Sequence, residues 1–181
     1  MRTKIGVMGS AAPDSARLDL GHGLVEKAEQ LARAIAKREV VLFTGATTGI
    51  VYVVGKGAHD AGCFHIGISP ANNKQEHVEH YKLPLDACDT IVYTGFGLKG
   101  RNVVLVRSCD VVLFVAGAMG SLNEFTIAHD EGKIIGCLTG TGGVAAEADY
   151  LLQKFGKRAT TSRVFQSSDP DELIDQCLQS L

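Results

Sequence analysis

Residues 110–121, DVVLFVAGAMGS, decide the fold class of this chain. The apolar run VVLFV at 111–115 is typical of a strand covered on both faces, as strands of parallel sheets are. A glycine-rich turn follows at once, and a helix is predicted after it as far as about residue 131. A buried strand that turns directly into a helix begins a βαβ unit, so this stretch predicts an α/β fold.

The same alternation of short apolar runs and helical patterns recurs along the chain. Further strands are predicted at 5–8, 40–44, 64–69, 90–94, 133–138 and 164–165. Helices are predicted at 24–35, 50–61, 98–108, 144–155 and after the acidic turn at 169–172, whereas the polar stretch 70–82 is predicted as loop. We therefore expect a single Rossmann-like domain over residues 1–181, with three α/β/α layers and a mostly parallel sheet of about six to seven strands.

Charge and cysteine content exclude several classes of function. The formal net charge is −2 and the lysines and arginines are scattered, so nucleic acid is not the expected partner. The 5 cysteines form no C-x-x-C pair, which predicts neither a disulfide framework nor a zinc site. No apolar run approaches a membrane span, and the N-terminal apolar stretch is too short for a signal peptide. A cytoplasmic protein without a membrane or metal partner is expected.

Glycine is in excess, with 21 residues among 181, against a usual share of about 7%. Three glycine-rich loops follow predicted strands, and the carboxyl ends of parallel strands meet at the edge where α/β proteins bind ligands. Such loops can serve merely as tight turns, but three at one edge favour a phosphate held against helix N-termini. The candidate ligand-binding residues are Gly9, Ser10, Gly45, Thr47, Thr48, Gly49, Gly117, Ala118, Met119, Gly120 and Ser121.

Two charged residues stand beside these loops. Glu124 lies three residues past Ser121, which suits either a capping box or a carboxylate that points into the ligand cleft. Arg101 is either a surface cation or a clamp for a phosphate or carboxylate. We take Arg101 and Glu124 as the candidate catalytic residues.

Two other polar groupings carry weaker signals. His77 and His80 lie three apart in the polar stretch, but no third ligand is evident, so a solvated loop is predicted there. Asp14 and Ser15 are predicted to cap the first helix.

Two segments together resemble one known family. Residues 100–125, GRNVVLVRSCDVVLFVAGAMGSLNEF, and the glycine loop, helix and strand at 44–70 resemble the core of the LOG-like (SLOG) superfamily. The resemblance extends over about residues 4–140. That family carries an Arg before a strand and then a Pro-Gly-Gly-x-Gly-Thr-x-x-Glu loop. The positions that match this pattern are Arg101, Gly117, Gly120, Ser121 and Glu124.

The chain also departs from the family pattern. Ala116 replaces the proline, Ala118 the second glycine, Asn102 the lysine after the arginine, and Ala46 a glycine of the loop at 45–49. The Arg-Asn version resembles the branch that includes molybdenum cofactor carrier proteins. Members of the superfamily carry the label lysine decarboxylase, but no pyridoxal site is visible here.

The resemblance leaves two main functions open. One is a carrier or sensor that binds a nucleotide-like or pterin phosphate without turnover, with the molybdenum cofactor or a nucleotide as its ligand. The other is a nucleoside 5′-monophosphate phosphoribohydrolase, in which Glu124 would stabilise positive charge on the ribose and Arg101 would hold the phosphate. A DNA-processing relative is a third reading, which the charge balance disfavours. The resemblance also implies a homo-oligomer, either a dimer or a tetramer.

Overall fold

A computed structural model describes residues 1–11 and 22–181, residue 22 by its backbone alone. The predicted cap at Asp14 and Ser15 lies outside the described residues. The strands are β1 (Thr3–Gly9), β2 (Val40–Thr44), β3 (Phe64–Ser69), β4 (Thr90–Tyr93), β5 (Val111–Val115), β6 (Ile134–Leu138) and β7 (Arg163–Ser167). The helices are α1 (His22–Ala36), α2 (Ile50–Asp60), α3 (Lys74–Glu79), α4 (Gly97–Arg107), α5 (Met119–Asp130), α6 (Gly143–Ala146), α7 (Ala148–Phe155) and α8 (Pro170–Gln179).

The strands form one 7-stranded sheet in the order β4-β3-β2-β1-β5-β6-β7. Every neighbouring pair is parallel. The chain first builds outward from β1 to β4 and then returns to the other side of β1 with β5. The connections therefore reverse direction between β1 and β5, which is the position where open α/β sheets bind ligands. The predicted Rossmann-like fold with a parallel sheet is confirmed.

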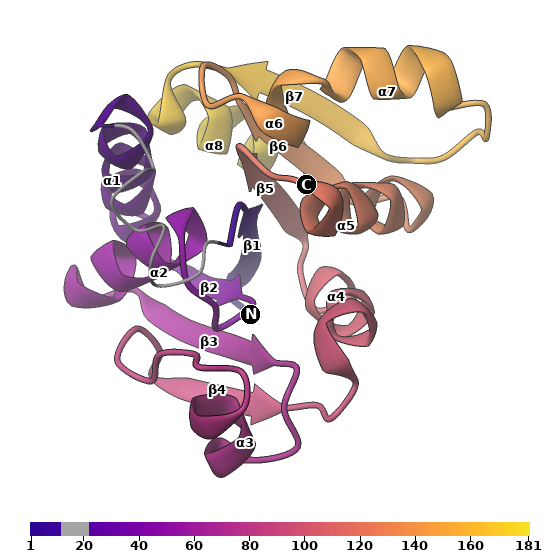
Figure 1. Cartoon of the computed structure of the whole chain (residues 1–181). Helices are drawn as coiled ribbons and strands as arrows, with labels where there is room; N and C mark the ends of the chain where they lie inside the picture. The colour runs from indigo at the N-terminus through magenta and orange to yellow at the C-terminus, as the bar shows by residue number, and fades with distance from the viewer. Residues whose placement is uncertain (12–21) are drawn as a thin grey trace.

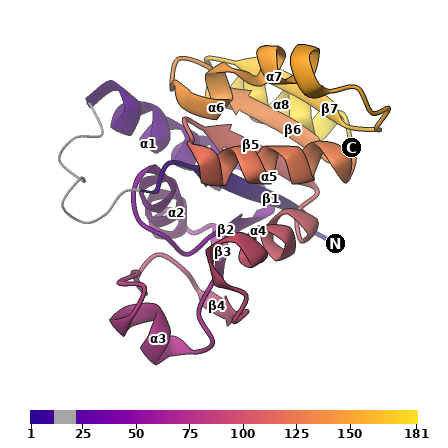
Figure 2. The same ribbon diagram turned by 45° about the vertical axis from the view of Figure 1, so that its right-hand side comes forward.

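Two apolar clusters lie on opposite faces of the sheet and create the three layers. One cluster joins the sheet to α1, α2 and α8, and the other joins it to α4, α5, α6 and α7 (Figures 1 and 2). Strand β5 contributes side chains to both clusters: Leu113 belongs to the first and Phe114 to the second. The ring of Phe114 packs edge-on against that of Phe125, with 5.4 Å between the ring centroids. This double burial explains why VVLFV is apolar throughout.

The segment predicted as a loop at 70–82 contains helix α3. The side chain of Asn73 accepts a hydrogen bond from the backbone N–H of Glu76 at 3.0 Å and so caps the helix. His77 on this helix is fully buried, so the prediction that it lies in a solvated loop is wrong. Its ring nitrogens lie 2.8 Å from Ser69 Oγ and 3.0 Å from the Pro84 carbonyl.

The predicted helix at 144–155 is divided into α6 and α7, with Glu147 between them. No helix in the described part of the chain has both the length and the apolar character that a membrane span needs. Within the described ranges, no group of three or more His, Cys, Asp or Glu side chains is arranged to hold a metal ion.

Candidate functional site

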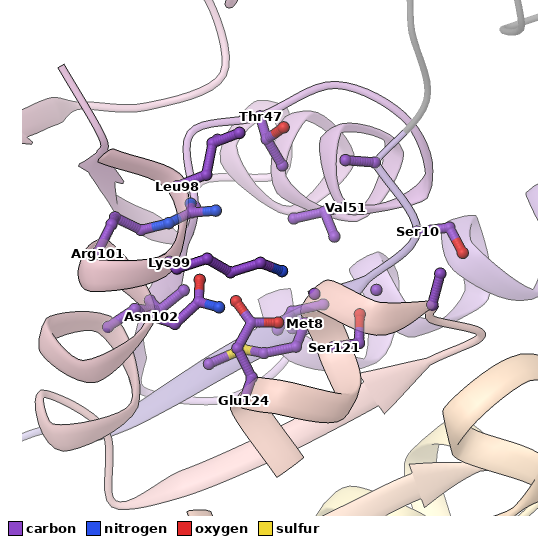
Figure 3. A pocket seen from close by; sticks show the side chains of 17 residues that line it. Met8, Ser10, Thr47, Val51, Leu98, Lys99, Arg101, Asn102, Ser121 and Glu124 are labelled. Carbon is purple, nitrogen blue, oxygen red and sulfur yellow. The ribbon is translucent and has the colours of Figure 1, made fainter. Parts of the chain in front are cut away.

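A cleft of about 210 Å³ opens at the reversal point, beyond the carboxyl ends of β1, β2 and β5 (Figure 3). Helices α4 and α5 supply charged and polar side chains to its lining, and Val51 and Leu105 are among the apolar side chains there. The lining residues are Val7, Met8, Gly9, Ser10, Ala11, Gly45, Thr47, Val51, Leu98, Lys99, Arg101, Asn102, Leu105, Ala118, Gly120, Ser121 and Glu124.

Ser10 lines the cleft and forms hydrogen bonds to two neighbouring elements. Its Oγ accepts a hydrogen bond from the N–H of Gly117 at 3.1 Å, and its carbonyl accepts one from the N–H of Ile50 at 2.9 Å. The loops after β1 and β5 and the start of α2 are thereby held in one arrangement. The oxygen of the Ser10 hydroxyl acts as the acceptor in the bond to Gly117, and among the described residues no acceptor engages its proton.

Hydrogen bonds from the segment after β6 fix the loop after β5. The N–H groups of Val144 and Ala145 donate to the carbonyls of Gly117 and Ala116, both at 3.0 Å. Thr141 Oγ1 accepts from the N–H of Ala116 at 2.9 Å. Ala116 has φ 53°, which proline cannot adopt because its ring fixes φ near −65°. The path of this loop therefore excludes the family's proline at position 116.

Helix α5 begins at the cleft without a side-chain cap. Its N-cap residue is Ala118, and Ser121 lies inside the helix, so the capping box considered for Ser121 and Glu124 is not formed. The first N–H groups of a helix have no partner within the helix and carry its partial positive charge. Ala118, Gly120 and Ser121 line the cleft, so this turn presents an anion site to it.

Arg101 reaches the cleft as a buried cation. Arg101 is only 7% exposed, and its Nη1 donates a hydrogen bond to the carbonyl of Ile68 at 3.2 Å. Its Nε has no hydrogen-bond partner among the described residues. Burial lowers the pKa of Arg101, while the charge of Glu124 opposes this shift.

Gly45 makes room for that guanidinium group. A Cβ at this position would overlap Nη1 and would lie 2.6 Å from Cζ of Arg101. The predicted role of Gly45 was a close backbone approach to a phosphate. The structure shows another reason for glycine at this position: the absence of a side chain leaves the space that the guanidinium group of Arg101 occupies beside the loop after β2.

Glu124 is the buried anion of the site. The residue is 6% exposed, and burial raises the pKa of its carboxyl to about 7, although the charges of Arg101 and Lys99 act in the opposite direction. With the Asn102 amide nitrogen turned toward this carboxylate, it donates to Oε1 at 3.1 Å and to the Leu98 carbonyl at 3.0 Å. The carboxyl group is thus oriented from α4 and points into the cleft (Figure 3).

The structure brings together nine of the sequence-based candidates and leaves four outside the lining. The nine that line the cleft are Gly9, Ser10, Gly45, Thr47, Arg101, Ala118, Gly120, Ser121 and Glu124. The four outside it are Thr48, Gly49, Gly117 and Met119. Met119 is 74% exposed, and Gly49 is the N-cap residue of α2 with φ 74°.

The sequence-based reasoning missed Lys99 and Asn102 as lining residues. Asn102 could have been found, because Leu98, Arg101, Asn102 and Leu105 recur at helical spacing and therefore share one face of α4. Lys99 lies three residues before Asn102, at the border of the same face, and its side chain also lines the cleft.

Comparisons with known proteins agree with this architecture. The profile of the SLOG cluster4 family matches residues 2–174. An uncharacterised protein of Archaeoglobus fulgidus is 27% identical over 177 residues, which are 98% of this chain and 95% of that protein. The X-ray structure of TM1055 has a TM-score of 0.81 at 25% identity, with 99% of both chains covered. The molybdenum cofactor carrier protein from Chlamydomonas reinhardtii has a TM-score of 0.75 at 25% identity, with both chains covered completely.

A more distant likeness shows the fold alone. DNA processing protein A from Helicobacter pylori has a TM-score of 0.61 at 16% identity, over 98% of this chain and 80% of that one.

Proposed function

The chain belongs to the SLOG cluster4 family, and on this premise we propose that it is a carrier or sensor that binds a nucleotide-like or pterin phosphate in the cleft between β1 and β5. The observation that carries the proposal is the buried Arg101, which lines the cleft and whose Nε lacks a partner among the described residues. The uncapped N-terminus of α5 lines the same cleft. An unsatisfied buried donor is costly, and a ligand that accepts its hydrogen bond removes that cost.

The charges in the cleft suit a phosphate monoester. Arg101 and Lys99 are two cations, and Glu124 contributes a partial negative charge because its pKa is about 7. The net charge of the lining is therefore positive, before the contribution of the α5 N-terminus is added. A phosphate at the first turn of α5 would receive backbone N–H donors and the helix dipole together.

The remainder of the cleft suits a flat heterocycle. Val7, Val51 and Leu105 supply apolar contact, while the Glu124 carboxyl and the Asn102 amide can pair with ring nitrogens or exocyclic groups. Both a purine nucleotide and the pterin phosphate of the molybdenum cofactor combine such a ring with a phosphate. The likeness to the molybdenum cofactor carrier protein from Chlamydomonas reinhardtii supports the second ligand. When bound, that cofactor would bring its own metal chemistry, and this chain would hold it and shield it.

A second candidate function is hydrolysis of the N-glycosidic bond of a nucleoside 5′-monophosphate. The pKa of Glu124 near 7 favours it, because a buried carboxyl that titrates near neutral pH can accept or supply a proton. In that reaction the ionised Glu124 would stabilise the oxocarbenium-like ribose and orient the attacking water.

One experiment separates the two functions: AMP is incubated with the purified protein, and adenine release and melting temperature are both measured. The proposal predicts no adenine and, at 100 times the dissociation constant, a rise in melting temperature of about 5–10 °C. Adenine release that is lost in Glu124→Gln and kept in the exposed Glu39→Gln would establish the hydrolase instead. Neither release nor a shift with AMP or a pterin phosphate would overturn both.

Three accompanying proposals rest on the sequence and on its resemblance to the family, from which the oligomeric state is taken. We propose that the protein works in the cytoplasm, that it forms a dimer or tetramer, and that a small phosphate-bearing ligand, not nucleic acid, is its partner. The formal net charge of −2 supports the last of these.

A further inference from the structure

Lys99 places a second cation over the cleft, from the first turn of α4. Its side chain extends toward the start of α5 (Figure 3). Its Nζ lies 3.7 Å from the position that a Cβ on Gly120 would take. In the part of the chain that the structure describes, no hydrogen bond or ion pair engages this ammonium group, although its charge lowers the pKa of Glu124.

The two cations of the cleft differ in what they can do. Arg101 is buried, and its guanidinium is fixed between Gly45 and the carbonyl of Ile68. Lys99 is exposed, and it stands at the mouth of the cleft on a long flexible side chain. Elsewhere on the protein, lysines pair with carboxylates, as Lys4 does with Asp110 at 3.1 Å and Lys37 does with Asp171 at 2.9 Å. Lys99 keeps its charge available above the α5 N-terminus.

Gly120 keeps the path between Lys99 and the helix open. It is the second residue of α5, so its N–H belongs to the turn that has no partner within the helix. Because it has no side chain, nothing stands between Lys99 Nζ and that turn. An anion placed there would touch backbone N–H donors on one side and an ammonium group on the other, in the same cleft that buried Arg101 lines.

We propose that Lys99 determines specificity for a terminal phosphate monoester, by closing over the phosphate that the first turn of α5 holds. This inference rests on the proposed function and adds the group that distinguishes a nucleotide from its nucleoside. A dianionic monoester gains a charge-assisted contact with Lys99. The uncharged nucleoside gains nothing from it, so Lys99 contributes only to the binding of the phosphorylated ligand.

The test is a calorimetric titration of AMP and of adenosine into the wild type, Lys99→Gln and a matched control, Lys157→Gln. Lys157 is exposed between α7 and β7 and does not line the cleft. Lys99→Gln is expected to weaken AMP binding about tenfold, which corresponds to about 1.4 kcal/mol. Adenosine affinity is expected to stay unchanged. The AMP affinity of Lys99→Gln should also fall less steeply with added salt than that of the wild type.

The outcomes separate this inference from the proposed function. If the wild type binds AMP and Lys99→Gln binds it equally well, the role of Lys99 is overturned while the proposed function stands. If Lys99→Gln weakens AMP and adenosine to the same extent, Lys99 acts on the cleft as a whole and the specificity role is overturned. If the wild type binds neither AMP nor adenosine, a nucleotide ligand is overturned together with the role of Lys99.

Discussion

A protein with Gly45→Ala is expected to lose AMP affinity by about a hundredfold, because the new methyl group would displace the guanidinium of Arg101. The Cβ would overlap Nη1, and the bond from Nη1 to the Ile68 carbonyl would be broken. Gly45 has no positive φ, so its backbone accepts alanine without strain. The change therefore acts on Arg101 and not on the loop conformation.

Arg101→Met and the double variant complete this test. If Gly45→Ala acts only through Arg101, each single variant and the double variant should show the same loss, and the two effects should not add. Gly23→Ala is the matched control, since a Cβ there meets nothing within 4 Å. AMP affinity that survives Gly45→Ala, or losses that add in the double variant, would show that the guanidinium position is not what Gly45 provides.

The stability of the protein is expected to depend on pH through Glu124. The pKa of its carboxyl is about 7 in the fold, against 4.5 for an ordinary glutamate, because burial disfavours the charged form. The folded protein therefore holds this proton more tightly than the unfolded chain does. The stabilisation is complete below about pH 4.5 and is lost as the pH rises to about 7.

Glu124→Gln should remove this dependence, because glutamine stays neutral at every pH. The pH dependence is measured by urea unfolding of the wild type and of Glu124→Gln between pH 4.5 and 8. All other titrating groups are common to the two proteins, so their contributions cancel when the two free energies of unfolding are subtracted. The variant should gain stability relative to the wild type by an amount on the order of 3 kcal/mol across that window. Glu39→Gln, an exposed control, should show no such trend. Parallel stability curves for wild type and Glu124→Gln would contradict a buried carboxyl with a raised pKa.

The strands could be predicted from sequence because each carries its own apolar signal. VVLFV at 111–115 is buried on both faces, and the strands at 40–44 and 64–69 begin and end where their apolar patterns do. Helix α3 was missed because its charged residues obscure helical periodicity. Its start could have been recognised from Asn73 followed three residues later by Glu76, an N-cap pattern.

The edge of the sheet at which the cleft opens could also be predicted, because parallel strands carry their carboxyl ends to one edge. The direction of each side chain could not. Gly45 and Arg101 lie far apart in sequence, and no local pattern shows that one makes room for the other. The support of the β5 loop by Thr141 and α6 is likewise a contact between distant segments. A loop sequence likewise does not show which of its residues face the cleft, and Thr48, Gly49, Gly117 and Met119 do not line it.

The claim that an anion is held at the first turn of α5 is tested most directly by titrating AMP into the wild type and into Gly120→Asp. A Cβ on Gly120 faces Lys99 Nζ at 3.7 Å, so the aspartate would place its carboxylate where the phosphate is proposed to lie. An acidic residue in the first turn suits the helix dipole, so the fold should be kept. Saturable AMP binding by the wild type and none by Gly120→Asp is the result that we predict. Equal AMP binding by the two proteins would contradict the account.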